Sequence, residues 1–149
     1  MTGSTRPGAR DEALQGALRE RLLHLPMRER KVLLHAAAIG RRFDVTLLAA
    51  IMGRTPAQIL PSLESACALQ ILEPVDDTRA RYRFRHALIR EAMYDELVAH
   101  RLRRLHRHIG ENLERLSPAC ATTIQELAYH FWAAGDRKRG CRYERRSRG

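Results

Sequence analysis

A single histidine stands where a strand pattern changes to a helix pattern. Tyr82 and Phe84 alternate with arginines up to His86, as in a half-buried strand, and the apolar residues after it recur at the spacing of one helix face. These apolar residues are Leu88, Ile89, Ala92, Met93 and Leu97. Because backbone N–H groups point outward at a helix start, a histidine there can join them in holding an anion. The junction therefore predicts contact with a phosphate.

The other residues that could do chemistry form weaker patterns. The remaining histidines have no carboxylate or cysteine at ligand spacing, so we interpret them as ordinary surface or core-edge residues and predict no metal site. They are His24, His35, His100, His106, His108 and His130. The three cysteines, Cys67, Cys120 and Cys141, form no CxxC pair and are typical of reduced thiols in a cytosolic protein. No Ser, His and Asp set has the spacing of a nucleophile site, so no catalytic residue is predicted.

The chain is basic, with 27 Lys and Arg against 17 Asp and Glu. One cluster comprises Arg79, Arg81, Arg83, Arg85, Arg101, Arg103, Arg104 and Arg107. It could bind nucleic acid or nucleotide phosphate, or it could be a solvated face that Glu91, Asp95 and Glu96 partly neutralise. The sequence has no apolar run near the roughly 20 residues of a membrane helix and no signal-peptide core. We therefore expect a cytoplasmic protein without a membrane partner.

The first two thirds of the chain predict helices followed by a hairpin. Residues 1–10 suggest a frayed leader; helices follow around Leu14–Leu25 and Met27–Ile39, the latter capped by Gly40. Asp44 can cap a third helix, and Thr55 with Gln58 forms a capping box for a fourth. A strand at 71–75, a turn at 76–79 and a return strand at 81–85 complete the pattern. The prediction is a mainly α chain with a winged-helix domain at 11–98, built of helices and a two-stranded β-hairpin.

A longer helical region follows the hairpin. Leu102, Leu105, Ile109, Leu113 and Leu116 keep helical spacing up to Ser117-Pro118. A second capping box, Thr123 to Glu126, predicts a helix with Phe131 and Trp132 in its core. We interpret residues 99–136 as a helical linker and the first helix of an α-helical hairpin of the TPR-like type.

Several groups of residues carry a resemblance to a known family. They are Leu25-Pro26, Ala36 to Phe43, Tyr82 to Tyr94, Leu105-His106, and Glu126 to Phe131 before Ala134-Gly135-Asp136, the long motif at 82–94 being the specific one. Over roughly Leu14 to Asp136 the chain resembles the part of a STAND-class signalling ATPase that follows the nucleotide-binding core. The most similar groups are the large LuxR-type transcriptional regulators and the predicted ATPases fused to adenylate cyclase domains.

The resemblance implies roles for named residues. In that family the winged-helix domain packs on the ATPase core, and a histidine at this junction contacts the phosphate of ADP. His86, with Arg85, would then sense nucleotide, and the helix through Leu88 and Arg90 would couple that contact to the repeats. The implied partners are a nucleotide-binding core and an output domain, in the same or another chain. The alternative is that His86 only satisfies a backbone carbonyl at a helix start.

The sequence departs from the family in two ways. It has no GxxxxGK[ST] phosphate loop and no Walker B strand, so we expect no enzyme activity and no cofactor in this chain, with ADP or ATP bound by a full-length relative. After Asp136 the family pattern expects apolar residues, whereas Gly140, Glu144 and several arginines stand there. We therefore expect residues 137–149 to be a basic, truncated tail that cannot pack.

The expected function is that of a non-catalytic regulatory fragment of an ATP-dependent STAND protein, coupling nucleotide state to an output domain. The alternative is a DNA-binding winged-helix transcriptional regulator. Its reading helix, Thr55 to Leu69, would offer Gln58, Ser62, Glu64 and Ser65 but no arginine or lysine for phosphate anchoring. A third possibility is an interaction scaffold without nucleotide involvement.

Overall fold

The computed structural model describes residues 7–76, 80–116 and 121–149. In these ranges the chain is mainly helical, with eight helices and a three-stranded antiparallel sheet. The helices are α1 (Pro7–Leu23), α2 (Met27–Ile39), α3 (Val45–Ile51), α4 (Pro56–Ala68), α5 (Ala87–Asp95), α6 (Ala99–Leu116), α7 (Ala121–Ala133) and α8 (Arg137–Arg148). The strands are β1 (Arg42–Asp44), β2 (Leu72–Pro74) and β3 (Arg81–Phe84).

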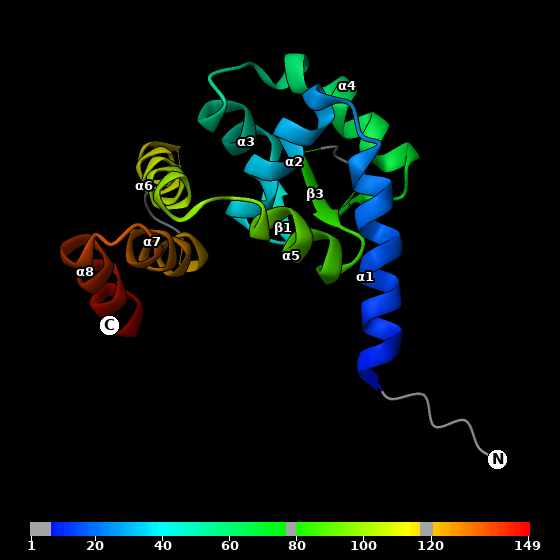
Figure 1. Ribbon diagram of the computed structural model, residues 1–149. Coiled ribbons are helices and arrows are strands. Elements are labelled where there is room, and N and C mark those ends of the chain that lie inside the picture. Colours follow the sequence, from blue (N-terminus) through cyan, green and yellow to red (C-terminus); the bar gives the residue numbers. More distant parts are fainter. Residues whose placement is uncertain (1–6, 77–79, 117–120) are drawn as a thin grey trace.

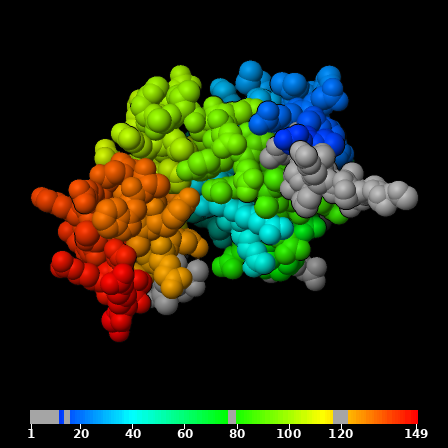
Figure 2. All heavy atoms as spheres, turned by 60° about the horizontal axis from the view of Figure 1, so that its bottom comes forward, coloured from blue at the N-terminus to red at the C-terminus, as the bar shows by residue number. Residues whose placement is uncertain are grey.

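The elements form two groups that pack on each other (Figure 1). We call α1–α5 with the sheet the sheet-bearing part, and α6–α8 the helical unit. The helical unit lies on one side of the molecule and α1 on the opposite side, with the sheet between them. Contacts of α6 with α2 and α3 join the two groups, and the space-filling view shows α7 close against the sheet-bearing part (Figure 2).

Side chains at several helix starts satisfy backbone N–H groups that have no partner inside the helix. The Asp44 Oδ1 atom accepts hydrogen bonds from the N–H groups of Thr46 at 2.7 Å and Leu47 at 3.3 Å. At α4, Thr55 and Gln58 form the reciprocal capping box. Both predicted caps are thus confirmed. Gly40, the predicted cap at the end of α2, has φ 154° and ψ −173°, a conformation open essentially to glycine alone.

The sheet has three strands, in the order β1-β3-β2. The prediction of a two-stranded hairpin is therefore incomplete, because β1 pairs with β3 through Arg42↔Arg83 and Phe43↔Tyr82. With only three residues between two helices, β1 is too short to show an alternating pattern. Phe43, Tyr82 and Phe84 are buried beneath the sheet, whereas Arg42 lies exposed on the opposite face.

The main core lies between the sheet and the helices of the sheet-bearing part. The predicted inward face of α2 is confirmed, because Val32, Leu33, Ala36 and Ala37 are all buried. The same core continues into the helical unit through Ile109. Within the described residues, no helix combines the length and the apolar character needed to cross a membrane.

Three boundaries differ from those expected. Helix α1 begins at Pro7, inside the segment expected as a leader, and residues 1–6 lie outside the described ranges. Helix α7 begins at Ala121, so the predicted start at Thr123 is wrong, and Thr123 is a buried residue inside the helix. Residues 77–79 of the predicted turn, and Ser117-Pro118, lie outside the described residues.

The expectation that residues 137–149 cannot pack is wrong. Residues Arg137–Arg148 form α8, which lies along α7. Tyr143 is buried and stacks on Phe131 with ring centroids 5.8 Å apart. Gly140 makes the close approach possible, because a Cβ added there would lie 2.9 Å from the Trp132 ring. Phe131 is a core residue as predicted, but Trp132 remains 39% exposed.

Candidate functional site

His86 lies at the junction that the sequence predicted. Strand β3 ends at Phe84 and α5 begins at Ala87, which makes His86 the N-cap residue of α5. Its backbone is extended, and its carbonyl accepts a hydrogen bond from the Ile89 N–H at 3.1 Å. The imidazole is exposed and makes no capping hydrogen bond to the helix. The ring therefore faces outward, where a group from outside this chain could reach it.

Arg85, the second residue expected to sense nucleotide, is exposed just after β3. Its backbone N–H donates to the Ile71 carbonyl at 3.0 Å, which extends the pairing of β2 and β3 by one residue. On the neighbouring strand β2, a hydrogen bond from Arg83 lowers the pKa of Glu73, and the charges of Arg83, Arg85 and Arg41 add to this effect. One carboxylate thus stands among several guanidinium groups.

The two expected coupling residues contact the body of the fold. Leu88 is half-buried against the main core. The Arg90 Nε atom donates to the Ala37 carbonyl at 2.8 Å, and its guanidinium carbon lies 4.6 Å from the centroid of the Tyr94 ring. Arg90 therefore ties α5 to the last turn of α2. That these residues transmit a signal stays a prediction.

The members of the arginine cluster lie on different elements of the fold. Those on α6 are exposed: Arg101, Arg103, Arg104 and Arg107. Glu96, which was expected to neutralise part of the cluster, pairs with Arg30 of α2. That Glu91, Asp95 and Glu96 neutralise part of the cluster stays a prediction. Arg79 lies outside the described residues.

Two histidines form a buried pair between α6 and α7. The side chain of His106 is fully buried and that of His130 is 1% exposed, and their Nδ1 atoms lie 2.8 Å apart. The Tyr94 hydroxyl of α5 lies 3.0 Å from the Nε2 atom of His106. The expectation that these two histidines are surface or core-edge residues is wrong, because each takes an inward position of its helix.

The hydrogen bonds of this cluster assign the ring tautomers. A hydrogen bond between the His130 ring and the backbone of Ile39 favours the charged ring, so the ring donates and the Ile39 carbonyl accepts. Since the Nδ1 atom of His130 faces His106, the donor to Ile39 is Nε2–H. His106 then donates its Nδ1–H to His130 and accepts the Tyr94 O–H at Nε2. The result is one continuous chain, Tyr94–His106–His130–Ile39.

Both rings are held neutral. Burial, followed by the nearby charge of Arg90, lowers the pKa of His106 to about 4. Burial, then His106 and Arg90, lowers the pKa of His130 to about 3, against the opposing hydrogen bond to Ile39. The same surroundings raise the pKa of Tyr94, mainly through burial.

The burial of His106 and His130 could have been predicted from their spacing in the sequence. His106 stands four residues after Leu102 and three before Ile109, so it occupies a position of the apolar stripe of α6. His130 stands three residues after Leu127 in the same way. What the sequence could not show is that these two positions face each other, because that depends on how α6 and α7 pack.

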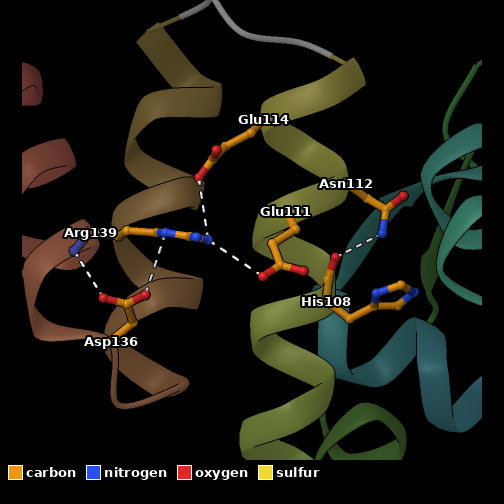
Figure 3. Close-up of polar contacts among 6 residues, drawn as sticks. All are labelled: His108, Glu111, Asn112, Glu114, Asp136 and Arg139. Atoms are coloured by element: carbon orange, nitrogen blue, oxygen red, sulfur yellow. Dashed lines mark hydrogen bonds and ion pairs between the residues drawn. The ribbon is translucent and has the colours of Figure 1, made fainter.

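A second polar cluster holds the helical unit together (Figure 3). From α8, the Arg139 side chain reaches α6, where its Nη1 atom lies 3.5 Å from Glu111 and 3.9 Å from Glu114. Its Nε atom lies 3.5 Å from Asp136, which also caps α8. The guanidinium group stands 5.0 Å from the centroid of the Phe131 ring of α7. Arg139 therefore connects all three helices.

Within the described parts of the chain, no group of three or more His, Cys, Asp or Glu side chains is arranged to hold a metal ion. Cys67 and Cys141 are free thiols, and Cys120 lies outside those parts. Burial raises the pKa of the Cys67 thiol, with Glu64 and Glu73 adding to the effect. No protein-family model, curated protein or solved structure matches the chain.

Proposed function

We propose that this chain is a non-catalytic regulatory module of a STAND-type signalling ATPase. Helices α2, α3 and α4 with the three strands would form its winged-helix domain, and α6–α8 would begin its TPR-like repeats. ADP or ATP would be bound by a nucleotide-binding core, in the same or another chain, against the exposed side of His86 and Arg85. The module would pass the state of that contact to an output domain.

The observation that carries the proposal is the position of α5. Its first residue follows the exposed His86, and Tyr94 near its end hydrogen-bonds to His106 of the helical unit. A helix of nine residues is about 13 Å long, so α5 spans the distance from the junction to the helical unit. Arg90 contacts both α2 and the Tyr94 ring. A displacement of His86 would therefore be transmitted through α5 to the contact between Tyr94 and the helical unit.

The chemistry of the N-cap position supports a role beyond local stability. Asp44, Thr55 and Asp136 each accept a hydrogen bond from their own helix, as N-cap side chains commonly do. His86 makes no such bond. A capping side chain typically stabilises a helix by about 1 kcal/mol. A histidine here leaves that stabilisation unused, which fits a residue that serves an external ligand.

DNA recognition is the weaker alternative. In α4, which would be the reading helix, Ser62 is 2% exposed and cannot reach a base. Gln58 is held in the capping box, where its Oε1 atom accepts the Thr55 N–H at 2.9 Å. The exposed residues Glu64 and Ser65 supply no positive charge for phosphate contacts, and such contacts usually supply a large share of the affinity for DNA.

The test joins the chain to the nucleotide-binding core of a STAND ATPase and follows release of a fluorescent ADP analogue. We expect His86→Ala to speed ADP release by about tenfold or more, equivalent to the loss of one charge-assisted hydrogen bond. The matched control is His100→Ala, which removes another exposed histidine away from the junction. Equal release rates for His86→Ala and the unaltered protein would refute the proposal.

Two measurements on the chain alone separate the alternatives. Titration calorimetry with ADP or ATP should show no tight binding, because the core would supply most ligands; tight binding would contradict the proposal. Fluorescence anisotropy with duplex DNA should show only weak binding. Affinity in the nanomolar range with a steep dependence on salt would favour the DNA-binding regulator instead.

A further inference from the structure

The hydrogen-bonded chain Tyr94–His106–His130–Ile39 crosses the joint between the two parts of the molecule. Its two ends belong to the sheet-bearing part, Tyr94 in α5 and Ile39 at the end of α2, whereas both histidines belong to the helical unit. Buried polar groups must keep their partners, because an unpaired one costs roughly 1–3 kcal/mol. This series of hydrogen bonds therefore fixes the position of the helical unit on α2 and α5.

The surroundings of the pair disfavour positive charge. Arg90 of α5 is close enough to lower the pKa of both rings, and Tyr94 stands on the same helix with Asp95 acting on it. From α7, Tyr129 lies edge-on to His106 with centroids 5.8 Å apart. Helix α2 offers the Ile39 carbonyl, and α3, which also packs on α6, has no titratable side chain. Arg90 is thus the charge that a protonated ring would meet.

We propose that this chain of hydrogen bonds is a proton-sensitive latch, which holds the helical unit on the sheet-bearing part while both histidines are neutral and loosens when they take up protons. The inference goes beyond the proposed function, because it involves no nucleotide and would hold whether or not His86 contacts one.

The first proton would go to the Nε2 atom of His106. Of the four ring nitrogens in the histidine pair, it is the one that accepts a hydrogen bond from outside the pair. Tyr94 would then have to turn its O–H away from His106, toward the Tyr129 side chain, which is within hydrogen-bond reach. The charged ring would remain buried beside Arg90 and away from water. Opening the joint hydrates the ring and separates the two charges. Protons therefore bind more tightly to the open arrangement and shift the population toward it.

The test is hydrogen–deuterium exchange of the whole chain from pH 7.5 to pH 4.5, corrected for the intrinsic effect of pH. We expect amides in α6 and α7 to be less protected than those of β3 and to lose at least about tenfold of their protection between pH 7 and pH 5, so that they exchange freely at a pH where β3 is still protected. In the double variant His106→Phe/His130→Leu the selective loss should disappear. The control variant His108→Gln alters an exposed histidine of the same helix and should behave like the unaltered protein.

Two results would overturn the latch. One is equal protection of β3, α6 and α7 at every pH, which would show that these elements open only when the whole protein unfolds. The other is an unchanged pH response in the double variant. Should that variant not fold, ¹⁵N NMR of the imidazoles in the unaltered protein decides: the latch requires both rings to stay neutral until protection falls. Rings that titrate near pH 6.5 while protection is intact would refute it.

Discussion

The Nδ1 atoms of His106 and His130 face each other at 2.8 Å across the contact between α6 and α7. Only one of these two atoms carries hydrogen, because two N–H groups cannot occupy that separation. The hydrogen bond therefore runs in one direction, from the Nδ1–H group of His106 to the Nδ1 atom of His130. The Ile39 carbonyl sets this direction, because it accepts the hydrogen bond of the His130 ring. A site of this kind is sensitive to pH and to the charges around it.

The free energy of unfolding should decrease as the pH falls from about 6.5 toward 4. Unfolded histidine has a pKa near 6.5, whereas the folded values are about 4 for His106 and about 3 for His130. In that range the unfolded chain binds protons that the folded chain does not. Each ring adds a slope of about 1.4 kcal/mol per pH unit, so the stabilisation is complete above pH 6.5 and is lost in acid. Urea unfolding at several pH values measures this, and a flat profile would contradict the buried neutral pair.

Arg90→Met should raise the pKa of both buried histidines. The charge of Arg90 lowers both values, but burial contributes more, so the new values should remain below 6.5. Arg90→Lys keeps a positive charge and should leave the values closer to those of the unaltered protein. Titration of the imidazole ¹⁵N signals compares the three proteins. Identical pKa values in Arg90→Met would show that the guanidinium group does not act on the pair.

His86→Asp should stabilise the isolated chain. An aspartate at the N-cap can accept a backbone hydrogen bond, and its charge suits a helix N-terminus, so we expect a gain of about 0.5–1 kcal/mol. Asp44→Ala removes a cap that is present and should cost about 1 kcal/mol. Denaturant unfolding of both variants at pH 7 gives the comparison. A loss of stability in His86→Asp would mean that the histidine supports the junction in some way of its own.

Gly110→Ala should destabilise the helical unit. A Cβ at this position would lie 2.8 Å from the Phe131 ring, and overpacking of this kind typically costs about 1–3 kcal/mol. The matched control is Gly16→Ala in α1, where an added Cβ meets nothing within 4 Å. There the better helix propensity of alanine should raise stability by up to about 1 kcal/mol. Thermal unfolding of the two variants should therefore shift in opposite directions.

The sequence was most informative where the signals are local. The caps at Asp44 and Thr55, the inward face of α2, and the strand-to-helix change at His86 all follow from neighbouring residues, and the structure confirms these positions. The role assigned to His86 stays a prediction, because it depends on a partner outside this chain.

The features that sequence reasoning missed depend on long-range contacts. Strand β1 exists because β3 offers it hydrogen bonds, and the pairing of His106 with His130 depends on the packing of two helices. The misjudged segment at 137–149 shows the same limit. Its packing depends on Gly140, which stands where the family pattern expects an apolar residue but makes room for an aromatic ring, and on the single aromatic residue Tyr143.

The strand order has a consequence for synthesis on the ribosome. Translation delivers β1 first and β2 second, but the strand that must lie between them, β3, emerges last. The two outer strands cannot pair with each other, so the sheet remains unassembled until Phe84 has left the exit tunnel. The next residues to emerge are the junction and α5. The nascent chain therefore completes its sheet and exposes His86 in nearly the same moment of elongation.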